Sequence, residues 1–554
     1  DPVEGTNFNE WRANGWDVNG TTVGYASGTP ALPGHAVPFQ LAVYGPVQGC
    51  DGVLVPAQAG QLATLVAANP PSTTFCLAPG IHYETQVEPK DGNRFIGEPG
   101  AILSGAKVLD PAQAVHHFGD IYYWEGQTQE GFSNGQIISG GNDRDLHPEE
   151  LFVNGDTRYR HVEAVLPYHD ADKDPALDWV DEPGEWFFDY EADRIYIYGN
   201  PAGSLIETSV KEFAIAPVWW NYASAADYPD DVVIENLVVE KYANPGQFGA
   251  IGAQAHGANG SDSWTLRHVE VRYTHACGVR LVNGGTIENA SIHHNGQIGV
   301  CGSGDGDEAS LPVTIVDSEV RDNRVLDFNP TWEGGGVKLV HFGDASVANT
   351  AVVGNAGPGF ISHEVESLDF LRNLVSGNSH TPVAIRHTPT GSAVVHRNQI
   401  LDNGIESVGD EGAGVEIRHH GSTTGLVTTA ITENLIDGNR WGLFAPDVDG
   451  TNHAYTATDN VIRAADPGHW VHQIRHTTSS APNTVVDRNT YHVTSQSDTR
   501  WFYGAAGQPL SGMNFATWPY DGMGSTATFG TAPQMPVGGE AYQAAAYGPR
   551  LRAL

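Results

Sequence analysis

The sequence predicts an all-β fold: a right-handed parallel β-helix, a three-sided solenoid with an N-terminal cap helix and a β-rich insertion. Short apolar segments recur along about half of the chain, and asparagine closes them at a spacing of about one coil. The 66 glycines and 3 methionines among 554 residues favour short strands and tight turns over long helices. Because a solenoid grows by stacking coils, a chain of this length need not divide into several globular cores.

The repeat is plainest after residue 230. Its strand-like segments are Val232–Val239, Thr265–Val271, Gly285–Ile292, Pro312–Ser318, Ala393–Ile400 and Thr428–Ile436. Asparagine recurs at Asn295, Asn323, Asn355, Asn378, Asn403 and Asn439. A basic period of about 22–25 residues, lengthened by loop insertions, is typical of a three-sided β-helix coil. Asparagine tolerates the left-handed backbone of a tight turn, so these residues are expected to form a hydrogen-bonded ladder between coils.

The other segments lack this repeat and set the expected boundaries. Residues 56–68 have helical spacing at Leu62, Leu65 and Val66 and precede two prolines, which predicts a short helix over the first coil. Residues 115–228 are rich in Trp, Tyr and charge, and parts of them alternate as antiparallel strands do. The predicted division is an extended N-terminal arm (1–52), a cap helix and first coils (53–114), a β-rich insertion (115–228), parallel β-helix coils (229–500), and a C-terminal cap and tail (501–554).

Charge and cysteine content narrow the functional classes. A formal net charge of −38 disfavours non-specific binding to nucleic acids or anionic membranes. No run of about 18 apolar residues is present, so no membrane span is expected. Cys50, Cys76, Cys277 and Cys301 lack zinc-site spacing and fit two disulfides made in an oxidising compartment, with buried thiols as the alternative. The polar start at Asp1 is typical of a mature N-terminus, so a secreted, extracellular protein is expected.

Five segments carry a family resemblance: Phe75–Gly80, Pro89–Gly100, Val239–Asn244, Trp332–Lys338 and Gly354–Phe360. They resemble secreted bacterial right-handed β-helix proteins of the pectate-lyase-like superfamily, and the resemblance runs from about residue 53 to 530. It implies a protein of the polysaccharide lyase or glycoside hydrolase type, in a superfamily that also holds epimerases and non-catalytic surface proteins. The resemblance further implies acidic residues in the two coils after Gly-Pro-Gly, where this chain has His363 and Arg386 instead.

Aligning the later coils on their first apolar residue reveals two columns. One reads Val340, His363, Arg386, Arg418, Pro446, Arg475, and the next reads His341, Glu364, His387, His419, Asp447, His476. Neighbouring strands lie about 4.8 Å apart, so side chains within one column touch. Strand alternation turns Val383, Ile385, Val415 and Ile417 inward, and leaves Lys338, His363, Arg386, Glu416 and Arg418 facing out along one groove. The facing of the second column, at the boundary between strand and turn, is left open.

These residues suit three kinds of chemistry. In β-elimination from a uronate, an arginine or lysine neutralises the carboxylate, and a lysine, arginine or histidine removes the C5 proton. Hydrolysis needs two carboxyl groups roughly 5–9.5 Å apart, a pair that Glu364, Glu416 and Asp447 can supply. Histidine and carboxylate ligands on successive coils suit a transition metal. The structural alternative is a solvated strand face whose cations pair with these carboxylates.

The candidate catalytic residues are Lys338, His363, Glu364, Arg386, His387, Glu416, Arg418 and His419, and the candidate substrate-binding residues are Asp447, Arg475 and His476. The candidate metal ligands are His341, Glu364, His387 and His419; no cofactor is required, and a divalent metal ion is the alternative.

The sequence therefore predicts an extracellular carbohydrate-active enzyme that cleaves glycosidic bonds of a polysaccharide. A lyase acting on an acidic polysaccharide is slightly favoured over a glycoside hydrolase. A non-catalytic glycan-binding or surface β-helix protein is the third interpretation. The expected partner is a polysaccharide or oligosaccharide and no nucleic acid, and the chain is expected to be a monomer.

Overall fold

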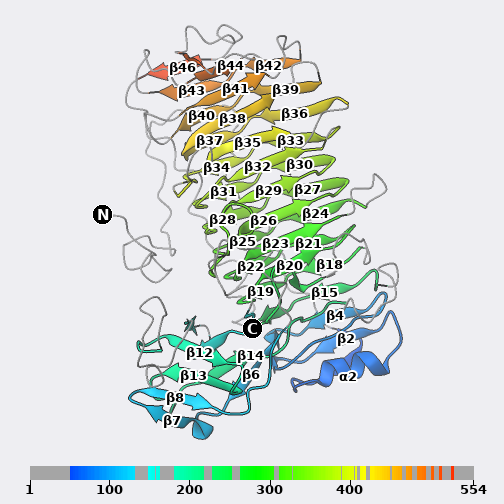
Figure 1. Cartoon of the computed structure of the whole chain (residues 1–554). Coiled ribbons are helices and arrows are strands. Elements are labelled where there is room, and N and C mark those ends of the chain that lie inside the picture. The colour runs from blue at the N-terminus through cyan, green and yellow to red at the C-terminus, as the bar shows by residue number, and fades with distance from the viewer. Residues whose placement is uncertain are drawn as a thin grey trace, which may run out of the picture.

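The computed structural model describes residues 50–131, 147–155, 157–162, 180–217, 228–252, 263–304, 311–326, 328–388, 390–404, 406–407, 412–419, 425–448, 452–464, 470–476, 483–493, 501–504, 511–513 and 526–529. Within them the chain forms one long stack of parallel strands (Figure 1). Each full coil contributes one strand to each of three sheets, called sheets A, B and C here. The predicted three-sided parallel β-helix is therefore confirmed.

Sheets A and B run along the whole stack. Sheet A contains β1 (Val53–Val55), β2 (Thr74–Leu77), β4 (Arg94–Gly97), β15 (Val233–Glu235), β18 (Thr265–Arg267), β21 (Thr286–Glu288), β24 (Val313–Val316), β27 (Asp344–Ala348), β30 (Ser367–Leu371), β33 (Ser392–His396), β36 (Val427–Thr432), β39 (His453–Thr458) and β42 (Thr484–Asp487). Sheet B contains β3 (Gly80–His82), β5 (Ala101–Ser104), β16 (Val238–Glu240), β19 (Glu270–Arg272), β22 (Ser291–His293), β25 (Glu319–Arg321), β28 (Ala351–Val353), β31 (Leu374–Ser376), β34 (Gln399–Leu401), β37 (Leu435–Asn439), β40 (Val461–Ala464), β43 (Thr490–Val493) and β46 (Thr526–Phe529).

Sheet C carries the candidate groove. It contains β17 (Gly249–Ile251), β20 (Cys277–Leu281), β23 (Ile298–Ser303), β26 (Gly335–Val340), β29 (Phe360–His363), β32 (Val383–His387), β35 (Ala413–His419), β38 (Trp441–Val448), β41 (His472–His476), β44 (Trp501–Gly504) and β45 (Ser511–Met513). All neighbouring strands in this sheet pair in parallel except β44 and β45, which pair antiparallel.

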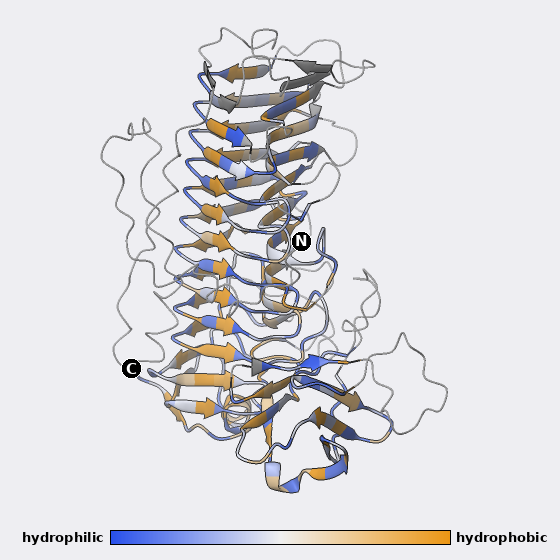
Figure 2. Cartoon of the chain, turned by 90° about the vertical axis from the view of Figure 1, so that its left-hand side faces the viewer, coloured by the Kyte–Doolittle hydropathy of each residue, from blue (hydrophilic) through white to orange (hydrophobic). Residues whose placement is uncertain are grey.

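The interior of the stack is apolar because each short strand turns alternate residues inward. Equivalent positions stack from coil to coil, as in the sheet C series Val337, Phe360 and Val383, which are all buried in one continuous core. Burying each such side chain contributes roughly 1.5–3 kcal/mol to stability. Figure 2 shows the result, hydrophobic strand segments joined by hydrophilic bends in one coil after another.

Left-handed residues turn the chain from sheet A into sheet B. Their φ angles lie between 48° and 59°, and they are Asn236, His268, Asn289, Asp317, Asn349, Arg372, Arg397, Glu433, Asp459 and Arg488. In the later coils an asparagine follows directly, and these residues form a ladder of Asn373, Asn398, Asn434, Asn460 and Asn489. The sequence reasoning did not identify this ladder.

The predicted asparagine ladder lies at the other end of sheet B and is confirmed. The Nδ2 amide of each member donates to Oδ1 of the next at 2.7–2.9 Å, in the order Asn295, Asn323, Asn355, Asn378, Asn403, Asn439. Each amide from Asn295 to Asn439 also donates to a backbone carbonyl of an earlier coil. The ladder therefore satisfies buried backbone groups at a bend where strand pairing ends.

Helix α2 (Gln61–Ala68) covers the first coil, as predicted. Its Leu62 and Val66 are buried and Leu65 packs against the same core. Gly60, which has a left-handed backbone, precedes the helix. The helix ends at Ala68, and Asn69 caps it before Pro70.

The insertion lies between β5 and β16 in the sequence. These two strands nevertheless pair directly with each other in the stack, so the chain leaves the stack after β5. One of its sheets has the order β10 (Thr157–Arg158), β9 (Leu151–Val153), β14 (Ile206–Ser209), β6 (Ala106–Leu109). The other has the order β11 (Arg160–His161), β12 (Glu185–Asp189), β13 (Arg194–Tyr198), β8 (Ile121–Trp124), β7 (Val115–Phe118), and a short 3₁₀ helix spans Pro111–Gln113. The two sheets share a core around Trp124, Trp186 and Phe188. Figure 1 shows the insertion beside the first coils, at the N-terminal end of the stack.

The cysteines form two disulfides, Cys50–Cys76 and Cys277–Cys301, with Cα–Cα distances of 5.7 and 6.2 Å. The second joins β20 to β23, neighbouring strands of sheet C, as the one-coil spacing suggested. Among the described residues no helix is long and apolar enough to cross a membrane. Most of the expected N-terminal arm, 1–49, lies outside the described residues.

Candidate active site on sheet C

The strand register places the first four members of the first predicted column as the sequence reasoning expected. Val340 pairs with His363, His363 with Arg386, and Arg386 with Arg418, on four successive coils. The residues predicted to face inward, Val383, Ile385, Val415 and Ile417, are all in the buried core. The alternating cations therefore lie on the outer face of sheet C.

Trp332, in the loop before β26, gathers three of these side chains around its ring. Nζ of Lys338 and Cζ of Arg386 each lie 4.4 Å from the ring centroid. The imidazole of His363 meets the same ring edge-on, with centroids 5.1 Å apart. Cations over an indole face are attracted by its quadrupole, and the attraction grows when water is excluded. We call Trp332, Glu333, Lys338, His363 and Arg386 the cation cluster.

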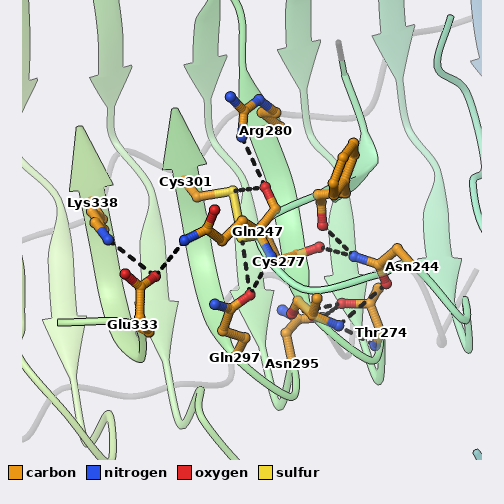
Figure 3. The surroundings of a disulfide bond; sticks show 12 residues. Asn244, Gln247, Thr274, Cys277, Arg280, Asn295, Gln297, Cys301, Glu333 and Lys338 are labelled. Carbon is orange, nitrogen blue, oxygen red and sulfur yellow. Dashed lines mark hydrogen bonds and ion pairs between the residues drawn. A yellow bond between two sulfur atoms is a disulfide. The ribbon is translucent and has the colours of Figure 1, made fainter. Parts of the chain in front are cut away.

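Lys338 is the most buried cation of this cluster. Its Nζ donates to Oε2 of Glu333 at 3.2 Å, and Nε2 of Gln247 donates to the same oxygen at 2.8 Å (Figure 3). Burial lowers the pKa of Lys338, and the nearby Arg386 and Arg280 lower it further, whereas Glu333 opposes the change. A lysine with a lowered pKa is more often neutral, and only the neutral form can accept a proton.

The disulfide Cys277–Cys301 lies beside the loop that carries Gln247. The Gln247 carbonyl accepts a hydrogen bond from Nη1 of Arg280 at 2.8 Å and lies 3.6 Å from Sγ of Cys301 (Figure 3). Its backbone N–H donates to Oε1 of Gln297 at 2.7 Å. Burial lowers the pKa of Arg280 to about 10. These contacts fix Gln247, and through it the carboxylate of Glu333 that holds Lys338.

A second group of candidates lies at the end of β29. Nε2 of His341 lies 2.7 Å from Oε2 of Glu364, and Nε2 of His363 lies 4.0 Å from Oε1 of the same carboxylate. One ligand atom from each of these three residues lies within 4.8 Å of the other two. All three remain partly exposed, with 43% of the His341 side chain, 25% of Glu364 and 13% of His363 accessible to solvent.

His387 lies elsewhere, although it occupies the same column as His341 and Glu364. It is 1% exposed, and its Nε2 shares a hydrogen bond with Oγ1 of Thr429 at 2.8 Å, which in turn contacts Nε2 of His453 at 2.8 Å. His341 and Glu364 have φ of 55° and 53°, whereas β32 continues as extended strand through His387. Alternation then turns His387 into the solenoid once Arg386 faces out.

The upper part of the groove combines charge with aromatic rings. Nε of Arg418 forms an ion pair with Oε1 of Glu416, and Cζ of Arg418 lies 5.3 Å from the ring of Phe444. Trp441 and Trp470 pack beside Phe444, with their ring centroids 4.4 Å apart and their planes tilted by 41°.

Four candidates have described backbones only. The backbone of His419 pairs with that of His387, and Asp447, Arg475 and His476 lie in β38 and β41. Their side chains lie outside the described part of the chain. The sequence reasoning also missed Trp332, Glu333 and Gln247. Trp332 and Glu333 lie just before the strand that contains Lys338. This closeness in sequence is the signal by which they could have been included among the candidates.

A separate charged cluster lies on the outer face of sheet B. Nη1 of Arg272 donates to Glu270 at 2.8 Å, Nε2 of His293 contacts Glu270 at 3.2 Å, and Nε of Arg321 donates to Glu319 at 3.3 Å. Burial raises the pKa of Glu319 to about 7. The neighbouring coil surface meets the insertion through Lys241 and Glu207, whose Nζ and Oε2 lie 2.8 Å apart. None of the predicted site residues belongs to this cluster.

Comparison with known proteins agrees with this architecture. A family model described as a right handed beta helix region matches residues 256–436. A search of curated proteins finds no match.

Three solved structures resemble the chain at low sequence identity. XylC in complex with xylose is 12% identical, with 79% of this chain and 84% of that chain covered and a TM-score of 0.48. The Azotobacter vinelandii mannuronan C-5 epimerase AlgE6 A-module is 12% identical, with 85% and 94% covered and a TM-score of 0.35. The pectate lyase Pel9A is 10% identical, with 83% and 78% covered and a TM-score of 0.27.

Proposed function

We propose that this protein is a secreted carbohydrate-active enzyme that cleaves glycosidic bonds of an acidic polysaccharide by β-elimination. The observation that carries the proposal is the convergence of Lys338, His363 and Arg386 on the single ring of Trp332. The two disulfides support secretion, since such bonds persist in oxidising compartments.

An anionic sugar is the ligand that suits this charge pattern. The chain as a whole carries a formal charge of −38, yet Arg386 and Arg418 occupy paired positions on neighbouring strands. Like charges directly opposite one another repel; the ion pair of Glu416 with Arg418 offsets part of this repulsion, and a bound carboxylate relieves it further. A guanidinium binds a carboxylate through two parallel hydrogen bonds, which also fixes its orientation.

The cluster supplies the groups that the elimination needs. Arg386 binds the uronate carboxylate and stabilises the negative charge that develops on it when the C5 proton leaves. Lys338 is the base that takes that proton when it is deprotonated, and its lowered pKa makes the deprotonated form more accessible. The C5–H electron pair forms the double bond between C4 and C5, the C4–O bond breaks, and solvent water protonates the departing oxygen.

Hydrolysis fits the carboxylates less well. Glu364 is engaged by His341, and Glu416 is engaged by Arg418. Their strands, β29 and β35, are separated by β32, which corresponds to about 10 Å at two strand spacings. That is at the upper limit of the carboxyl separations used by inverting glycosidases, roughly 6.5–9.5 Å.

A binding role without catalysis is the second candidate function. The pair Trp441 and Trp470, whose ring planes are tilted by 41° and of which Trp441 is largely buried, supports it, with Cζ of Arg440 5.4 Å from the Trp441 ring. Flat aromatic groups of this kind offer apolar area together with a polar edge, as ligand-binding surfaces commonly do.

A panel of acidic and neutral polysaccharides separates these functions. Elimination gives an unsaturated uronate that absorbs ultraviolet light, hydrolysis gives reducing ends without that absorbance, and a binding protein gives neither product but retains the glycan. Arg386→Ala is expected to lower the elimination rate on the order of 10²-fold. Arg372→Ala, an exposed arginine at the bend between sheets A and B, is the matched control and should leave the rate unchanged. Equal rates in both variants would contradict the assigned role of Arg386.

A further inference from the structure

We propose that His341, His363 and Glu364 bind one divalent transition-metal ion, of which zinc is the representative. The three residues come from two adjacent coils, β26 with its following bend and β29 with its following bend. Their nearest ligand atoms lie within 4.8 Å of one another. This site shares His363 with the cation cluster, but none of its argument depends on a substrate.

The ligand types determine the kind of ion. Two imidazole nitrogens and one carboxylate oxygen suit zinc and its neighbours in the first transition series, whereas calcium and magnesium prefer oxygen ligands throughout. Two histidines and one glutamate also make up a common open zinc site, in which water occupies the fourth position.

The distances are close to those that a metal requires. With bonds of about 2.1 Å in a tetrahedral arrangement, ligand atoms lie about 3.4 Å apart. Nε2 of His341 lies 2.7 Å from Oε2 of Glu364 and has to move slightly away, whereas Nε2 of His363 lies 4.0 Å from Oε1 of the same carboxylate, which has to turn so that one oxygen faces both rings. Both changes have the size of a small side-chain rotation.

The backbone orients this set before any ion binds. His363 faces outward as the last residue of β29, and left-handed conformations at His341 and Glu364 bring those side chains to the same face. The His363 ring packs edge-on against Trp332, which limits its rotation. Because His341 and Glu364 keep 43% and 25% of their side-chain surfaces exposed, an ion can reach the site from solvent.

The surrounding charges specify what completes the coordination. Arg386 pairs with His363 across the strands and so lies near the site, while Lys338 is held by Glu333. A cation beside these groups is most stable when its open position holds an anion, either hydroxide or a carboxylate. The site is therefore expected to bind zinc together with such an anion.

Titration of the full chain with a metal salt tests the proposal directly. After treatment with a chelator, wild-type protein is titrated with zinc chloride by calorimetry, and its melting temperature is measured with and without zinc. Cobalt chloride provides a visible absorption spectrum that reports the ligand geometry. We expect one bound ion that His341→Asn, His363→Ala and Glu364→Gln each weaken by on the order of 100-fold or more, with loss of the cobalt spectrum.

The variants are chosen so that a folding defect does not obscure the result. Asparagine tolerates the left-handed backbone at position 341, and glutamine keeps the shape of Glu364. His116→Ala, an exposed histidine in the insertion, is the matched control and should bind zinc as the wild type does. Absence of zinc binding by the wild type, or equal binding by the wild type and all three ligand variants, would overturn the proposal. Elimination activity is measured separately, so its absence leaves this result standing.

Discussion

Glu319→Gln should change how the stability of this protein depends on pH. Glu319 is fully buried in β25, where it accepts hydrogen bonds from Oγ of Ser291 and from Nε of Arg321. Burial is the main reason that its pKa is raised to about 7, with Asp322 adding to the effect and Arg321 and Ser291 opposing it. The protonated acid is therefore the form that suits the folded protein.

The direction and size of the change in stability with pH follow from the difference between the folded and unfolded pKa of Glu319. The folded pKa exceeds the unfolded one, so folding takes up a proton between pH 4.5 and about 7. The stabilisation from Glu319 is complete below pH 4.5 and is lost as pH rises through about 7. At about 1.4 kcal/mol per pH unit, the loss amounts to roughly 3 kcal/mol. Glutamine resembles the protonated acid and does not titrate, so the variant should not suffer this loss.

Urea unfolding of wild type and variant from pH 4 to 8 measures the difference. Two buried histidines act in the opposite direction in both proteins, because burial lowers the pKa of His294 to about 4 and of His472 to about 3. Their contribution cancels in the comparison, so the informative quantity is the variant minus the wild type at each pH. The free energy of unfolding of Glu319→Gln, taken relative to that of the wild type, should rise by roughly 3 kcal/mol from pH 4 to pH 8. A difference that stays constant with pH, or that falls as pH rises, would refute this reasoning.

Three further predictions concern the groove and the ladder. Lys338→Met should lower the free energy of unfolding by about 3 kcal/mol, because it leaves the buried Glu333 carboxylate without its cation. Adding Glu333→Gln should restore most of that stability without restoring activity, and recovery of activity by the double variant would mean that Lys338 acts only structurally. Trp332→Ala should reduce turnover while Trp332→Phe retains part of it, measured as kcat on the active polysaccharide; equal kcat in both variants would contradict a role for the ring. Asn378→Ala should cost roughly 3 kcal/mol in urea unfolding, since it removes hydrogen bonds to Asn355, Asn403 and Val352 inside the stack, and a cost below 1 kcal/mol would contradict it.

Much of the fold could be predicted because the repeat carries its own constraints. The asparagines from Asn295 to Asn439 recur at one bend of each coil, and each occupies the ladder position that its spacing indicated. The second ladder escaped notice although its sequence signal is similar. Its asparagines are preceded by Arg372, Arg397 and Glu433. Arginine and glutamate do not indicate a left-handed turn in a sequence, whereas glycine does.

The groups around Trp332 could not be predicted from alignment of the strands. Trp332 and Glu333 lie in a loop outside the repeating unit, and Gln247 lies three coils earlier along the chain. Only the fold brings Gln247 within 2.8 Å of Glu333. A column argument finds residues that share a position in the repeat, and it misses those that reach the site from loops.

The composition of the proposed metal site depends on the backbone conformation of single residues. In the column His341, Glu364, His387, strand alternation alone turns every member inward, opposite to Val340, His363 and Arg386. Left-handed backbone at His341 and Glu364 reverses that direction, whereas extended backbone at His387 preserves it. Such a reversal costs about 1–2 kcal/mol for an ordinary residue. A folded protein tolerates this cost, but the cost makes the left-handed conformation uncommon, so the residue type alone does not predict it. For this reason the sequence left the facing of this column open, and the choice of His363 over His387 as the partner of His341 and Glu364 required the folded chain.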